Sequence, residues 1–319
     1  MNKVKCPLCS NFEHVKEVSY NKLFDNKIYL CSDCPISFDN PMPSLEELDE
    51  YYGRESDIRH KGERSSFTKA HKLKRWRRAY EQYDYIKQYF KKDSSDLLFV
   101  DFGCGLGNLI SLLSKSQYRV IGIEPNIEYR KNAPINIRNH IFGDLIEADI
   151  KNSDVVLILS HVLEHLNDPS EFLDHLLKHL KVKYIFVQQP LIQMGYIDYL
   201  IKKKKLGGEH IIMFSENSLN NFFKSKNFIP QKKIKTLYTG LANISVKEFI
   251  TDKNLKKQLI SSHKSQNLKM RFYRLFERFT IIFLSAKQIA KLTHKLKYFA
   301  PEKLATSITN VYINVDETI

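Results

Sequence analysis

VDFGCGLG, residues 100–107, joins an apolar run at 97–101 to a segment of helical periodicity at 106–114. Its three glycines let the backbone turn tightly and come close to a ligand, and a helix N-terminus lies behind them. Glu124 lies at the end of the next predicted strand, where a carboxylate accepts both hydroxyls of a ribose. The spacing is GxGxG, with Asn108 where a dinucleotide fingerprint has its third glycine. The unit therefore predicts an adenosine site; a glycine-rich turn without a ligand is the alternative.

Strands and helices alternate around this loop. The pattern predicts a helix at about 67–92 and two strands after residue 225 and before 250. Between them, the predicted strands are 97–101, 119–124, 154–159 and 183–188, and the predicted helices are 106–114, 169–180 and 216–225. Such alternation is typical of a mostly parallel sheet with helices on both faces, so we expect a doubly wound α/β domain.

Four segments together resemble the class I methyltransferases that bind S-adenosylmethionine. DFGCGLG from Asp101 resembles their first motif and IGIEP at 121–125 their second. FGD at 142–144 resembles their adenine-side acidic motif, and SHVLEHL at 160–166 the segment after their fourth strand. The resemblance covers about residues 97–250 and implies a Rossmann-like sheet of seven strands. The cofactor residues that it implies are Asp101, Phe102, Gly103, Gly105, Gly107, Asn108, Glu124, Pro125, Asp144, Ser160 and His161, with His161 beside the sulfonium.

Four of the five cysteines form two close pairs, Cys6-Pro-Leu-Cys9 and Cys31-Ser-Asp-Cys34. In a cytoplasmic protein such pairs indicate a metal site more strongly than disulfides. Their spacing lets four thiolates close tetrahedrally on Zn²⁺, which would leave no open position for catalysis. We therefore expect a small structural zinc-ribbon module; four reduced cysteines in a small core are the alternative.

The segment CSDCPISFDNPMPSLEELDEYY, residues 31–52, resembles the N-terminal zinc-binding domain of methyltransferases from bacterial polysaccharide and deoxysugar pathways. Phe38, the NPMP run at 40–43 and the pair Tyr51-Tyr52 match that domain, whereas Pro35 replaces its usual glycine. This resemblance implies methyl transfer to a nucleotide- or lipid-linked sugar in cell-surface polysaccharide biosynthesis.

An S-adenosylmethionine-dependent enzyme receives an activated methyl group, so it must position and deprotonate the acceptor. In the resembling sugar C-methyltransferases, a Glu-His-x-x-x-Phe-Ser segment after the fifth strand carries the proposed general base. His210 matches that base and Glu209 is its neighbour. The family tyrosine two positions earlier is replaced by Gly207, which leaves O- or N-methylation open. His210 as a helix cap is the alternative, and Glu164 and His165 are interpreted as residues that tie the fourth strand's loop to the domain.

The chain divides into a zinc-binding knuckle (1–43), a helical linker or cap (44–92), the S-adenosylmethionine-binding domain (93–252) and a basic amphipathic helical region (253–319). An apolar stripe at helical spacing runs through residues 268–290, within a strongly basic stretch. It predicts a helix packed on the domain or on the partner of a homodimer. A peripheral helix on an anionic membrane is the alternative.

Composition limits the classes of protein that fit. A hydrophobic content of 43% supports a sizeable core, and no apolar run approaches the roughly 20 residues that span a bilayer. The chain opens without the apolar core of a secretory signal. We expect a cytoplasmic enzyme, peripheral at the inner membrane face if residues 268–290 bind lipid.

Two functions other than sugar methylation are also compatible with the sequence. A zinc knuckle and a net charge of +14 also suit an rRNA or tRNA methyltransferase. The knuckle lacks the interleaved aromatic and basic residues of a base-stacking surface. A small-molecule or glycan substrate is therefore favoured over nucleic acid. A cofactor-binding scaffold without catalysis is the third hypothesis, because Gly207 and the Lys-Val-Lys turn at 181–183 depart from the family pattern.

Overall fold

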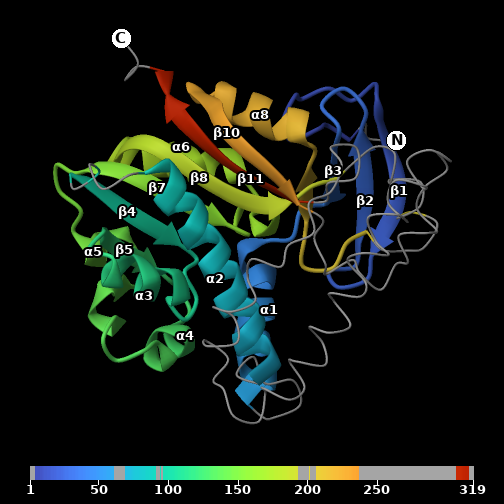
Figure 1. Ribbon diagram of the computed structural model, residues 1–319. Helices are drawn as coiled ribbons and strands as arrows, with labels where there is room; N and C mark the ends of the chain where they lie inside the picture. The colour runs from blue at the N-terminus through green and yellow to red at the C-terminus, as the bar shows by residue number, and fades with distance from the viewer. Residues whose placement is uncertain are drawn as a thin grey trace, which may run out of the picture.

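A seven-stranded sheet forms the centre of the computed structural model, which describes residues 4–60, 69–90, 94, 96–192, 201, 206–236 and 307–315 (Figure 1). The strand order is β10-β11-β8-β7-β4-β5-β6. The strands are β4 (Leu97–Phe102), β5 (Arg119–Ile123), β6 (Ile141–Phe142), β7 (Asp154–Ser160), β8 (Lys181–Pro190), β10 (Phe228–Thr236) and β11 (Ser307–Asn314). The five strands from β4 to β8 are parallel, whereas β11 is antiparallel to both of its neighbours. The expected doubly wound, mostly parallel seven-stranded sheet is confirmed.

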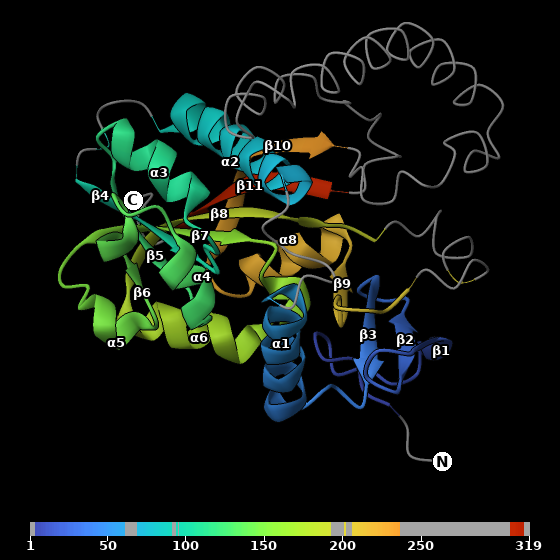
Figure 2. The ribbon, with the colours of Figure 1, turned by 90° about the horizontal axis from the view of Figure 1, so that it is seen from below.

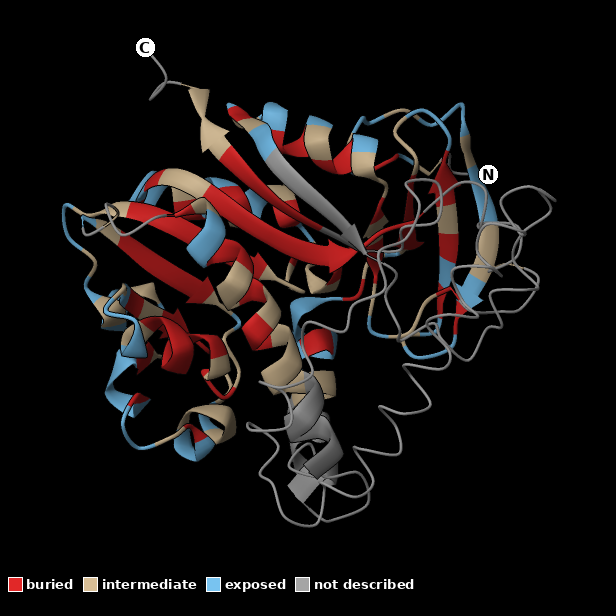
Figure 3. Ribbon diagram, viewed as in Figure 1, coloured by how far each residue is buried: buried red, intermediate tan, exposed pale blue. Residues whose placement is uncertain are grey.

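Helices cover both faces of this sheet, which is why its strands are apolar on both sides. Helices α2 (Lys69–Tyr89) and α3 (Asn108–Lys115) lie on one face, and α6 (Pro169–His179) and α8 (Glu216–Lys224) on the other (Figure 2). In β4, Phe99 packs with the α2 and α3 side chains, whereas Val100 packs with those of α6 and α8. Figure 3 shows the central strands buried along most of their length.

The C-terminal prediction is wrong for residues 307–314, because these residues form β11 rather than part of a helical extension. Strand β11 pairs with β8 from Ser307 opposite Pro190 to Ile313 opposite Tyr184. Val311 and Tyr312 are fully buried, one on each face of the sheet. The sheet domain therefore extends beyond residue 252, and the predicted helix at 268–290 lies outside the described residues.

The N-terminal module is a second sheet, of order β1-β2-β3-β9. Strands β1 (Val15–Asn21), β2 (Asn26–Cys31) and β3 (Ile36–Asn40) form an antiparallel meander. The fourth strand, β9 (Ile212–Phe214), follows β8 in the chain and pairs antiparallel with β3. The module thus includes a segment that directly follows His210, which the sequence did not indicate.

Shorter elements complete the arrangement. Helix α1 (Leu45–His60) follows the module, α4 (Ile127–Asn132) follows β5, and α5 (Leu145–Ala148) follows β6. Among the helices of the described residues, none has both the length and the apolar character required to cross a bilayer.

Candidate functional site

The glycine loop lies at the carboxyl end of β4, between the sheet and the N-terminus of α3. Gly103, Gly105 and Gly107 all have positive φ angles, of 65°, 56° and 67°. Gly107 precedes α3, and a Cβ there would lie 2.6 Å from Cδ1 of Ile137. A Cβ on Gly105 would lie 3.1 Å from Nη1 of Arg75. The loop therefore needs glycine both for its backbone conformation and for close approach.

Glu124 is tied to this loop through its side chain. Its Oε2 accepts a hydrogen bond from the Gly105 amide at 2.7 Å, and its Oε1 accepts one from the Asn126 amide at 3.0 Å. Burial raises the pKa of Glu124, while these amides and the nearby Arg75 and Arg130 lower it. Because a carboxylate oxygen has two lone pairs, each oxygen retains capacity for a further donor such as a ribose hydroxyl.

Two further predicted cofactor residues lie on β4, and a third starts the next helix. Asp101 is buried, and its burial together with the charge of Glu124 raises its pKa to about 8. The ring of Phe102 packs edge-on against Phe172 of α6 at 5.2 Å. Asn108 is the first residue of α3. The structure brings these residues together with the glycine loop.

Three predicted cofactor residues have structural partners in the described part of the chain. Asp144 caps α5 by accepting a hydrogen bond from the Glu147 amide at 2.8 Å. The carbonyl oxygen of Pro125 accepts a hydrogen bond from Arg130 at 2.7 Å. Ser160 accepts one from the side chain of Gln82 in α2. Their predicted roles toward the cofactor stay predictions.

A cluster of three histidines surrounds Glu164 at the carboxyl end of β7. Glu164 lies in a short 3-10 helix (Leu163–His165) and is fully buried. Its Oε1 lies 3.0 Å from Nδ1 of His161 and 4.0 Å from Nε2 of His165. The ring of His210 packs edge-on against that of His165, with 5.0 Å between the centroids. Burial raises the pKa of Glu164, but the contact with His161 and the charges that the three imidazoles carry when protonated outweigh burial and lower this pKa to about 2, so the carboxylate is ionised at neutral pH.

Two histidines of this cluster, His161 and His210, favour the neutral form. Burial lowers the pKa of His161 to about 4, and burial also lowers the pKa of His210. A neutral imidazole can accept a proton, so His210 has the protonation state that a general base needs. His161 has a positive φ of 55°, a conformation that is uncommon outside glycine and that occurs at functional sites.

Sequence reasoning missed two residues of the site. The first is Glu164, which is the buried carboxylate of the cluster. The predicted neighbour of His210, Glu209, has a side chain that is 50% exposed, and its Oε1 lies 3.9 Å from Nε2 of His210. The i, i+3 spacing of His161 and Glu164 was the available signal. The second missed residue is Arg75 of α2, which donates to the Tyr129 hydroxyl at 2.9 Å and stacks on its ring beside the glycine loop.

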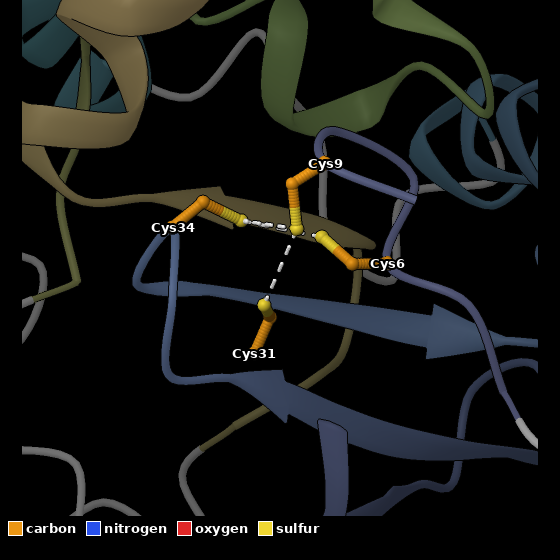
Figure 4. Close-up of side chains that lie close together, drawn as sticks. All are labelled: Cys6, Cys9, Cys31 and Cys34. Carbon is orange, nitrogen blue, oxygen red and sulfur yellow. Dashed lines mark hydrogen bonds between the residues drawn. The ribbon is translucent and has the colours of Figure 1, made fainter. Parts of the chain in front are cut away.

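The four paired cysteines converge on one point of the module (Figure 4). Sγ of Cys9 lies 3.7 Å from Sγ of both Cys31 and Cys34, and Sγ of Cys6 lies 3.2 Å from that of Cys34. A tetrahedral site with Zn–S bonds of about 2.3 Å requires sulfur atoms about 3.8 Å apart. The hydrogen bond from Cys34 lowers the pKa of Cys6 to about 5, whereas the same contact raises the pKa of Cys34 and burial raises that of Cys9, so without a metal the cluster favours one thiolate among thiols. The donor set fits a closed four-thiolate site.

The chain is similar to one protein family and to several solved structures. Its residues 71–231 match the family model described as "Methyltransferase domain". No curated protein matches the sequence. Similar solved structures include magnesium protoporphyrin IX methyltransferase from Synechocystis PCC 6803 with bound SAH, at 17% identity, a TM-score of 0.40, and coverage of 51% of this chain and 86% of that one. A SAM dependent methyltransferase from Archaeoglobus fulgidus has 17% identity, a TM-score of 0.41, and coverage of 74% and 94%.

The plantazolicin methyltransferase BpumL in complex with SAH is similar at 15% identity, with a TM-score of 0.40 and coverage of 85% of this chain and 90% of that one. The family match spans α2, the glycine loop, Glu124 and the histidine cluster, and it extends over half of the sequence. The chain belongs to the family of methyltransferase domains.

Proposed function

We propose that this methyltransferase uses S-adenosylmethionine and methylates a sugar, linked to a nucleotide or a lipid, in cell-surface polysaccharide biosynthesis. The observation that carries the cofactor is Glu124, whose two oxygens each hold one backbone amide and keep a lone pair for a ribose hydroxyl. Gly103, Gly105 and Gly107 turn the backbone beside it at positive φ angles, as in nucleoside-binding loops. When bound, S-adenosylmethionine supplies a methyl group on a positively charged sulfur.

His210 is the proposed general base for the acceptor. It is neutral because burial lowers its pKa, and it lies after β8, on the side of the sheet where the carboxyl ends of the parallel strands gather. As the acceptor atom forms its bond to the methyl carbon, His210 takes the proton that this atom releases. The charge that develops on the imidazolium is then stabilised by Glu164, the nearby buried carboxylate.

The acceptor class rests on the residues of the N-terminal module. Phe38, the Asn40-Pro41-Met42-Pro43 run and the Tyr51-Tyr52 pair resemble the corresponding domain of sugar-pathway methyltransferases. The module is joined to the segment after His210 through β9, which supports a role on the acceptor side. We place Zn²⁺ in its four cysteines, where four protein ligands make the metal structural.

The test supplies isotope-labelled S-adenosylmethionine with three acceptor pools: nucleoside-diphosphate sugars, lipid-linked glycans and total RNA. Label in a sugar supports the proposal, and label in RNA alone overturns the acceptor class. His210→Ala should lower turnover by about 10²- to 10⁴-fold and leave cofactor affinity intact. His175→Ala, an exposed histidine on α6, is the control and should behave as wild type. Wild-type turnover in His210→Ala would refute the base assignment.

A further inference from the structure

One side chain of the N-terminal module forms two hydrogen bonds with the backbone of the loop that carries His210. Oδ1 of Asn21 accepts a hydrogen bond from the Gly208 amide at 2.9 Å, and its Nδ2 donates to the Gly208 carbonyl at 3.0 Å. Asn21 is the last residue of β1 and is 1% exposed. It therefore satisfies both backbone groups of one residue, two positions before His210, from a segment 187 residues away in sequence.

Asn21 is itself held in place by the module. Its Nδ2 also donates to Oδ2 of Asp39 at 2.6 Å, and Asp39 is 1% exposed. Gly207 packs directly against strands β1 and β2. A Cβ added at Gly207 would lie 2.9 Å from Cδ1 of Ile28 in β2 and 3.0 Å from Cγ of Asn21 in β1. The positive φ angles of Gly207 and Gly208, 89° and 85°, therefore belong to a segment fitted closely to the module.

The other flank of His210 is fixed by the same module and by the histidine cluster. The carbonyl of Ile211 accepts a hydrogen bond from the Asp39 amide at 2.9 Å, and its amide donates to the carbonyl of Glu164 at 3.0 Å. The Glu209 carbonyl lies 2.9 Å from Nδ1 of His165. His210 thus lies between two anchored residues, and its backbone has little freedom to move relative to Glu164.

We infer that Asn21 is a positioning residue for acceptor deprotonation, which sets the backbone at Gly208 and thereby places the His210 imidazole against Glu164. The inference rests on the proposed role of His210 as the base. It assigns the N-terminal module to the acceptor half of the site, because Asn21 contacts the loop of the base and the glycine loop with Glu124 is built by other elements. Loss of Asn21 should disturb chemistry without disturbing cofactor binding.

The test uses Asn21→Ala in the full chain, with Asn26→Ala as the matched control. Asn26 faces Asn21 across the same hairpin and is buried, and its Nδ2 makes no hydrogen bond within the described residues. Three quantities are measured: kcat with the acceptor, the Kd for S-adenosylmethionine by calorimetry, and amide hydrogen exchange of a peptide covering residues 206–214. A misplacement of about 1 Å at a reacting group costs on the order of 100-fold in rate.

Asn21→Ala should lower kcat by about 10- to 100-fold, leave Kd within about twofold and speed exchange in residues 206–214. Asn26→Ala should change none of the three. Asn21→Ser, which keeps one donor and one acceptor on a shorter side chain, should show a smaller change in the same direction and serves if the alanine variant does not fold. Unchanged exchange in residues 206–214 overturns the inference whatever the activity. If Asn21→Ala shows faster exchange but His210→Ala keeps full turnover, Asn21 still anchors the loop and the assignment of His210 as the general base is refuted.

Discussion

Replacing Glu164 by Gln keeps the size of a fully buried side chain and removes its charge. The imidazole groups that face Glu164 lower its pKa from 4.5 to about 2. A shift of this size corresponds to about 3 kcal/mol of preferential stabilisation of the ionised form. A lowered carboxyl pKa stabilises the fold at pH values above 4.5, and this stability is lost as the pH falls from 4.5 toward 2. At pH 7 the variant should therefore lose up to about 3 kcal/mol of unfolding free energy.

Turnover should fall as well, because the amide cannot stabilise an imidazolium at His210. We expect a loss of about 10²- to 10⁴-fold, comparable to the value of a positioned acid or base. Urea unfolding at pH 7 and pH 4 and steady-state turnover with the sugar acceptor measure the two effects. Glu209→Gln is the control, since its half-exposed side chain should change stability by less than about 0.5 kcal/mol.

The outcome separates the two neighbouring carboxylates. If Glu164→Gln and Glu209→Gln have the same stability and the same turnover, the special role of the buried Glu164 carboxylate is refuted. Loss of turnover in Glu209→Gln alone would restore Glu209 as the functional partner of His210. The stability difference between the two variants should also narrow from pH 7 to pH 4, because protonation of Glu164 in the unfolded state begins in this range.

Three other changes test separate parts of the chain. Glu124→Ala should weaken S-adenosylmethionine binding by about 1.5–3 kcal/mol in calorimetry; unchanged affinity would contradict the cofactor site. Cys31→Ser should lose the one Zn²⁺ per chain that elemental analysis finds in wild-type protein; a metal-free wild type would refute zinc. Burial raises the pKa of Asp39 to about 7, so its charge destabilises the fold as the pH rises from 4 to 8. The free energy of unfolding of Asp39→Asn, measured in urea, should therefore rise relative to that of wild type between pH 4 and pH 8. A difference that stays constant over this range would contradict the raised pKa of Asp39.

The sequence was informative where a local pattern encodes the structure. The GxGxG loop requires positive φ angles, and the carboxylate of Glu124 follows at the end of the next strand, so the contact between this loop and Glu124 could be predicted from residues 101–124. The central strands were readable because they are buried on both faces and apolar throughout. The helix predicted at 216–225 is α8, Glu216–Lys224, and the structure shows Ser215 as its N-cap.

The acceptor half was not readable in the same way, because long-range pairing creates it. Strand β9 has three residues and no strand pattern of its own; it exists because β3 pairs with it. Strand β11 lies 117 residues after the end of β8 in sequence but pairs with it in the sheet. Glu164 has one local signal in the sequence, its i, i+3 spacing from His161, but only the fold shows that His210 also lies beside it. Asn21 gives no local signal at all.

The cofactor and acceptor halves of the site depend on different parts of the chain, and this bears on what the zinc site does. Cys31 pairs with Ile36 across β2 and β3, and Ile36 pairs with Phe214 across β3 and β9. All three residues are fully buried, and Phe214 is four residues after His210. A metal that holds Cys31 therefore holds, through two backbone pairings, the strand that anchors the base. The glycine loop and Glu124 have no such link, because they are fixed by β4, β5 and α3. In the proposed arrangement, a structural zinc would act on acceptor chemistry through the register of this small sheet, at a distance from the methyl donor.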